Sequence, residues 1–107
     1  MTFLADEMVG LIEQSRSPAL FALGRVFITL RALDVLRDAG EQPTALLRRH
    51  IRGDWSELTP GDVARNRQAI GQGLTILSVF TLKTAQRVYV LTECDRSATT
   101  ILLPSEY

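Results

Sequence analysis

Residues 74–81 (LTILSVFT), 87–92 (RVYVLT) and 99–103 (TTILL) decide the fold of this chain. Nearly every residue in these three runs is β-branched, aromatic or leucine, and these types fit a half-buried pleated surface. A short polar break separates the first two runs, and the polar segment 93–98 separates the last two. The pattern predicts a small antiparallel sheet over residues 74–107, with helices from earlier in the chain packed on one face.

The length of 107 residues is enough for one hydrophobic core and too short for two, so we expect a single domain over residues 1–107. With 46% hydrophobic and 22% charged residues, the composition is that of an ordinary soluble globular protein. Twelve basic residues balance twelve acidic ones, which gives no overall attraction to nucleic acid or to an anionic membrane.

The residues that usually mark a compartment or a cofactor are scarce. Cys94 is the only cysteine, and no apolar run approaches the roughly 20 residues that span a bilayer. We therefore expect a cytoplasmic protein that does not interact with a membrane. One cysteine and one histidine cannot make a zinc site, and no phosphate-binding or dinucleotide-binding glycine pattern is present, so we expect no metal and no cofactor.

The first two thirds of the chain are predicted to be mainly helical. Residues 2–14 have the apolar spacing of an amphipathic helix, which would make residues 1–17 a peripheral element. Residues 18–73 form the helical part, with one strand at 21–28, where apolar residues alternate weakly. A helix over residues 18–36 fits the same run, because short apolar runs do not distinguish the two.

Capping signals place the later helices. Thr29 is a suitable N-cap for a helix over residues 30–39 that stops at Gly40. Two more helices are expected over residues 44–50 and 60–70, each preceded by or starting with proline. The predicted fold class is α+β, with N-terminal helices packed on a small C-terminal antiparallel β-sheet of three to four strands.

Residues 48–55 carry the first group of candidate functional side chains. His50 is the only histidine and lies late in a helix, where the helix C-terminus favours its protonated form and suits a general acid. The alternative is that His50 is a structural residue, which caps the helix or bonds a backbone carbonyl. Arg49 and Arg52 could grip a phosphate backbone while Trp55 stacks on a base. Alternatively, Trp55 anchors the loop in the core and the arginines are solvated.

The polar residues between the last two predicted strands are the second group, namely Glu93, Asp95, Arg96, Ser97, Thr99 and Thr100. Such a dense set suits an anion-binding nest or an acid–base site, with Glu93 as general base and with Arg96 and Thr99 holding a phosphate. A turn also uses these residue types for its own structure, because Asp and Ser side chains readily bond nearby backbone groups.

Some of these residues recur in a longer set of motifs, made up of His50 with Gly53-Asp54-Trp55, Asp62, Asn66, Ser78, Thr92-Glu93, Asp95-Arg96-Ser97, Thr99-Thr100, Leu102-Leu103-Pro104 and Glu106-Tyr107. In this set the chain resembles a family of small bacterial proteins that are carried on plasmids and integrative elements and are often labelled plasmid-related proteins. The resemblance covers about residues 20–107. The layout is also similar to barnase-like or RelE-like RNases, which is an analogy of fold only.

Two functions follow as hypotheses. The first is an accessory protein of a bacterial mobile genetic element that acts as a non-catalytic protein-interaction module, with a host or plasmid protein or a second copy of the chain as its partner. The alternative is a metal-independent RNase-like toxin or nuclease domain, which would act on RNA through His50 and the cluster from Glu93 to Thr100. We favour the first, because small domains without a complete catalytic set are seldom enzymes.

Overall fold

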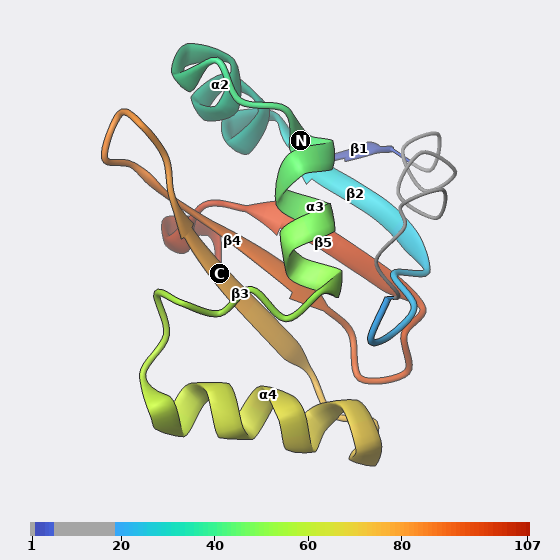
Figure 1. The fold of residues 1–107 in the computed structure, drawn as a ribbon. Coiled ribbons are helices and arrows are strands. Elements are labelled where there is room, and N and C mark those ends of the chain that lie inside the picture. The colour runs from blue at the N-terminus through green and yellow to red at the C-terminus, as the bar shows by residue number, and fades with distance from the viewer. Residues whose placement is uncertain (1, 6–18) are drawn as a thin grey trace.

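The computed structural model describes residues 2–5 and 19–107, which form helices packed against one mixed β-sheet (Figure 1). The elements in chain order are β1 (Thr2–Leu4), β2 (Arg25–Thr29), α2 (Leu30–Ala39), α3 (Pro43–Ile51), α4 (Pro60–Gln72), β3 (Ile76–Thr81), β4 (Arg87–Thr92), β5 (Ala98–Leu102) and the 3-10 helix η1 (Pro104–Glu106). The strand order is β1-β2-β5-β4-β3. The predicted α+β fold class is confirmed.

The sheet differs from the prediction in size and in strand direction. Among the described residues it has five strands, and β2 runs parallel to β5. The segment 21–28 does contain a strand and not a helix, but that strand begins at Arg25. The predicted helix over residues 2–14 is wrong at Thr2–Leu4, which pair with β2 because tertiary pairing overrides a local helical pattern. The rest of that predicted helix, from residue 6, lies outside the described residues.

Helix boundaries follow the capping signals closely. The Thr29 hydroxyl accepts a hydrogen bond from the Ala32 backbone N–H at 3.1 Å, and Gly40 ends α2 with a positive φ of 68°. Thr59 caps α4 in the same way, and Gly73 ends it with φ 65°. A left-handed conformation is strained for residues with a Cβ, which explains why glycine stands at both C-termini.

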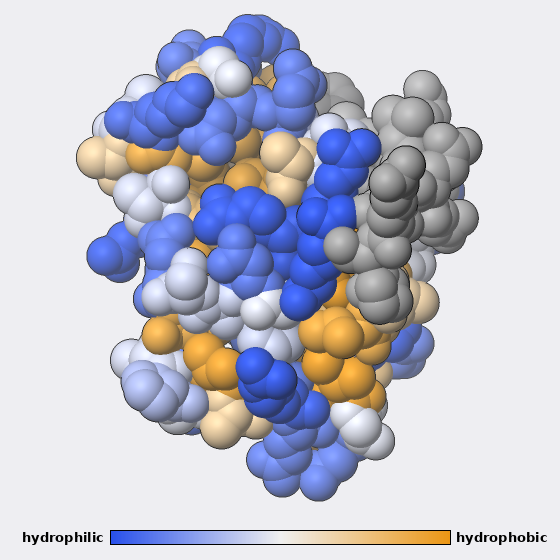
Figure 2. All heavy atoms as spheres, viewed as in Figure 1, coloured by the Kyte–Doolittle hydropathy of each residue, from blue (hydrophilic) through white to orange (hydrophobic). Residues whose placement is uncertain are grey.

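One face of the sheet forms the core with α2 and α3, and Figure 1 shows α3 crossing in front of the strands. Alternate strand residues point into this core, because side chains in a strand alternate between the two faces. These buried residues are Val26, Ile28, Ile76, Ser78, Phe80, Val88, Val90, Thr92, Thr99 and Ile101. On its outer side α3 is polar, and Figure 2 shows hydrophilic residues in the middle of this face.

The opposite face of the sheet is only half-buried. One row across it runs from Leu77 through Leu91 and Thr100 to Phe27, in the register of the four neighbouring strands. The remaining helix, α4, lies beside the edge strand β3 in Figure 1, away from α2. This placement leaves a solvent-accessible corner where α4, β3 and the half-buried face meet.

Candidate functional site

The only histidine of the chain lies in the core. His50 has no exposed surface, and both of its ring nitrogens contact hydroxyl groups of the sheet. Its Nδ1 lies 2.5 Å from Ser78 Oγ in β3, and its Nε2 lies 2.7 Å from Thr92 Oγ1 in β4. The ring of Phe21 packs against the imidazole edge-on, with 5.0 Å between the centroids. His50 therefore joins α3 to two strands.

The hydrogen bonds continue in both directions from this imidazole. On one side, the indole Nε1–H of Trp55 donates to Ser78 Oγ at 2.9 Å. On the other side, the hydroxyl oxygens of Thr92 and Thr99 lie 2.7 Å apart. Thr99 in turn donates to the backbone carbonyl of Leu23 at 2.7 Å. The result is a continuous buried chain of hydrogen bonds from an indole to a carbonyl.

Only one arrangement of protons satisfies every group in this buried chain. A hydroxyl carries one proton, and Thr99 uses its proton on the carbonyl. Thr92 must therefore donate to Thr99, and it can only accept from Nε2 of the imidazole. At the other end Ser78 accepts from the indole and donates its own proton to Nδ1. His50 is thus the neutral tautomer that carries its proton on Nε2.

Burial reinforces this assignment. Desolvation, followed by the positive charge of Arg96, lowers the pKa of His50 from 6.5 to about 3. A general acid must hold a proton that it can give and must reach the substrate. His50 is neutral at pH 7 and has no exposed surface, and Thr99 is buried as well. The structure therefore contradicts the roles predicted for His50 as general acid and for Thr99 as a phosphate ligand.

Arg96 is occupied by backbone carbonyls. Its Nη2 donates to the carbonyl of Ala69 at 2.7 Å, and its Nη1 donates to the carbonyls of Leu74, Glu93 and Cys94 at 2.6, 3.0 and 3.3 Å. Ala69 lies in the last turns of α4, whose final turn contains no basic residue. Arg96 places its positive charge at the negative end of that helix dipole. Its predicted role in holding a phosphate is not supported by this geometry.

The rest of the predicted loop cluster spreads over several environments. Asp95 accepts a hydrogen bond from the Ser97 backbone N–H at 2.9 Å, and bonding to Ser97 lowers the pKa of the Asp95 carboxyl. Glu93 is exposed, whereas Thr100 lies half-buried on the opposite face of the sheet from the histidine. The predicted base Glu93 and the buried His50 therefore share no accessible surface, and the loop is mainly a structural turn.

The predicted phosphate-binding group around α3 is also used internally. Arg49 donates through Nε to Asp54 Oδ2 at 2.6 Å, which lowers the pKa of the Asp54 carboxyl, and its guanidinium lies 4.3 Å from the ring centre of Phe80. Trp55 is 4% exposed and cannot stack on a base. Arg52 is exposed just after α3. The alternative in which Trp55 anchors the loop in the core agrees with the structure.

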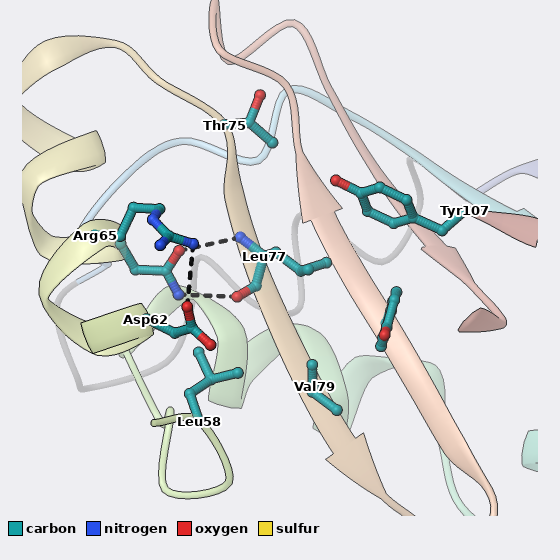
Figure 3. A pocket seen from close by; sticks show the side chains of 9 residues that line it. Leu58, Asp62, Arg65, Thr75, Leu77, Val79 and Tyr107 are labelled. Carbon is teal, nitrogen blue, oxygen red and sulfur yellow. Dashed lines mark hydrogen bonds and ion pairs between the residues drawn. The ribbon is translucent and has the colours of Figure 1, made fainter. Parts of the chain in front are cut away.

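A groove of about 380 Å³ lies between α4 and the half-buried face of the sheet (Figure 3). This volume falls within the range of known ligand pockets. We call it the β3 groove, and it is lined by Leu58, Asp62, Arg65, Asn66, Thr75, Leu77, Val79, Tyr89 and Tyr107. Four separate parts of the chain contribute to it. The first is α4 with the connection before it, and the second is β3 with Thr75 just before it. The third is β4, and the fourth is Tyr107, which follows η1.

The β3 groove has a tyrosine side and a charged side. Tyr89 of β4 and Tyr107 pack edge to face, with 5.7 Å between the ring centroids. Across the groove in Figure 3, Arg65 Nη1 donates to Asp62 Oδ1 at 3.1 Å on the exposed surface of α4. Tyrosine and arginine are over-represented in the energetically important parts of protein interfaces. The groove thus combines an aromatic wall with an accessible ion pair.

Two side chains cover the free edge of β3 beside this groove. The Asn66 amide donates to the Leu77 carbonyl at 2.8 Å and accepts from the Leu77 N–H at 3.2 Å. The Glu57 carboxylate accepts from the Thr81 N–H at 2.9 Å and from the Thr81 hydroxyl at 2.5 Å. An uncovered edge strand pairs readily with other chains, so these contacts limit such pairing.

No protein-family model, curated protein or solved structure matches this chain. Within residues 2–5 and 19–107 no three metal-ligating side chains are grouped together. The helices in that part of the chain are also too short or too polar to cross a bilayer. The resemblance to plasmid-related proteins accordingly remains a prediction.

No motif in the sequence marks the β3 groove as a site. Asp62, Asn66 and Tyr107 belong to the set of motifs that carries the resemblance, but their residue types and spacing do not indicate a shared role. Strand alternation could have indicated that Leu77 and Tyr89 face away from the core. The groove also depends on where α4 and the chain after η1 lie, and local patterns do not contain that information.

Proposed function

We propose that the chain is a non-catalytic protein-interaction module that binds its partner through the β3 groove. The observation that carries this proposal is that the groove side chains are accessible to a partner, whereas the candidate catalytic side chains are not. The residues with catalytic chemistry, His50 above all, are held in internal hydrogen bonds, whereas the groove presents tyrosines and an ion pair to solvent.

The composition of the groove supports a protein partner. Leu77 and Val79 of β3 and Leu58 line it with apolar groups, and Tyr89 and Tyr107 add two aromatic rings. Burying such a surface favours association, and aromatic anchors commonly dominate binding energy. The net charge of zero gives no general attraction to nucleic acid, which is consistent with this choice.

The biological setting rests on the resemblance. We infer an accessory protein of a bacterial mobile genetic element, whose partner is a host or plasmid protein. A second copy of the chain is the other partner that was expected from the sequence, and the same groove would serve in that case. Both versions share one requirement, which is that a change in the groove abolishes binding and leaves the fold intact.

Affinity capture with matched variants tests this requirement. Val79→Lys introduces a charge on the groove lining, and Gln86→Lys introduces the same charge in the turn between β3 and β4, outside the lining. A partner captured from a bacterial lysate supports the proposal if wild type and Gln86→Lys retain it equally and Val79→Lys loses it at least about tenfold. Its affinity is then measured with purified proteins by calorimetry.

A second outcome would contradict the proposal that the β3 groove binds the partner. If every captured protein binds all three chains alike, and the wild-type chain sediments as a monomer, the β3 groove is not the interaction surface. Circular dichroism of the two variants excludes unfolding as the cause of any loss.

A further inference from the structure

The backbone of β3 gives the groove a second kind of binding group. In the pairing of β3 with β4, Leu82 N–H donates to the Gln86 carbonyl, so alternate positions from Leu82 backward point toward β4. Leu77, Val79 and Thr81 are the positions in between, and their N–H and C=O groups point to the free edge. The hydrogen bonds of Asn66 to Leu77 and of Glu57 to Thr81 agree with this register, because they reach the backbone of these two residues from the free edge.

Val79 is the uncovered position between the two covered ones. None of the described residues provides a bond to its outward N–H or C=O, and Val79 lines the β3 groove. A backbone donor and acceptor pair on a strand edge is the binding group used when an extended peptide adds to a sheet. The groove therefore offers one backbone pair together with its apolar and aromatic walls.

We infer that the occupant of the β3 groove is an extended segment of a partner protein, one residue of which pairs with the Val79 backbone through two hydrogen bonds. This inference rests on the proposed function and adds the conformation of the partner. Asn66 and Glu57 limit the pairing, because Leu77 and Thr81 are four residues apart, or about 14 Å along the strand. Only about three partner residues fit between them in extended form.

The same geometry specifies the side chain of the pairing residue. Residues directly opposite each other in a sheet point their side chains to the same face. The partner residue opposite Val79 therefore places its side chain on the half-buried face, beside the side chain of Val79 and toward Leu58, whereas Tyr89 lies on the other side of Val79, on β4. An apolar or aromatic side chain fits that position, and flanking polar groups of the partner would lie near the Asp62–Arg65 pair.

The test uses a phage-displayed library of random nine-residue peptides selected against the full chain. Peptides that bind wild type and Gln86→Lys, and not Val79→Lys, are taken as groove ligands. Each backbone amide of such a peptide is then N-methylated in turn, and affinity is measured by fluorescence anisotropy. We expect one methylated position to weaken binding at least about tenfold and the positions two residues away to have little effect.

This pattern separates a single bridge from ordinary strand addition, in which every second amide is sensitive. On binding, the Val79 amide should also become more protected from hydrogen exchange, as measured by NMR. Groove peptides that tolerate methylation everywhere, or that lose affinity at several positions, overturn the single-bridge inference but leave the proposed function standing. Failure to select any peptide sensitive to Val79→Lys counts against both.

Discussion

At the scale of single residues, the buried imidazole of His50 makes the stability of the protein depend on pH. Its pKa is about 3 in the folded state and 6.5 as the ordinary value, so between these limits the unfolded chain binds more protons than the folded one. The neutral imidazole makes its full contribution to the free energy of unfolding above pH 6.5, and this contribution decreases as pH falls toward 3. The loss approaches about 1.4 kcal/mol per pH unit within this window.

Urea unfolding of wild type and of His50→Gln between pH 4 and pH 7 measures this effect. Glutamine can accept from Ser78 and donate to Thr92 without titrating, so it serves as the control. As pH decreases, the unfolding free energy of wild type should fall relative to that of His50→Gln. A difference that stays constant across the range contradicts the neutral buried histidine.

The threonines of the sheet provide a second prediction at this scale. Thr92→Val removes the acceptor for His50 and the donor to Thr99, which leaves the buried Nε2–H of His50 unsatisfied and should cost about 1–3 kcal/mol, although Thr99 keeps its bond to the Leu23 carbonyl. Thr100→Val makes the same change on the half-buried face and should alter stability by less than about 0.5 kcal/mol. Equal costs for the two variants, measured by urea unfolding, would show that the buried chain of hydrogen bonds contributes nothing.

At the scale of elements, the turn between β4 and β5 is held against the loop before β2. Gly24 has a φ of 65°, and a Cβ at this position would lie 2.3 Å from the Arg96 carbonyl oxygen. Gly24→Ala should therefore lower the melting temperature strongly. Gly71→Ala is the matched control, because Gly71 lies in α4 with open space around it, and it should stabilise the protein by about 0.5–1 kcal/mol. If Gly24→Ala has the melting temperature of wild type, the backbone at Gly24 does not lie as close to the Arg96 carbonyl as the structure has it.

The elements also show which parts of the fold local patterns can predict. Thr29 and Gly40 bound α2 as expected, because capping depends on neighbours within the same helix turn. The pairing of Thr2–Leu4 with β2 was not predicted, since the partner strand is more than 20 residues away and the local spacing favours a helix.

At the scale of the whole molecule, the candidate site depended on contacts that no local pattern contains. Ser78 and Thr92 lie 28 and 42 residues after His50, and only their meeting in the core converts a candidate acid into a structural residue. The spacing of polar residues could indicate that the last turn was important. It could not indicate that Arg96 would turn toward the end of α4.

Self-association is the last property that follows from the fold as a whole. The net charge of zero provides little electrostatic repulsion between copies, so coverage of the β3 edge matters for keeping them apart. Glu57→Ala would free the outward N–H of Thr81 next to that of Val79, which creates two successive positions for strand pairing. Sedimentation velocity should then show a dimer fraction that rises with concentration.

Glu93→Ala is the control for this experiment, because it removes the same charge from an exposed residue in the β4–β5 turn. If Glu93→Ala associates as strongly as Glu57→Ala, loss of charge explains the effect and the exposed edge does not. If only Glu57→Ala associates, the carboxylate of Glu57 protects the β3 edge. The same edge then limits how long a partner segment can pair with Val79.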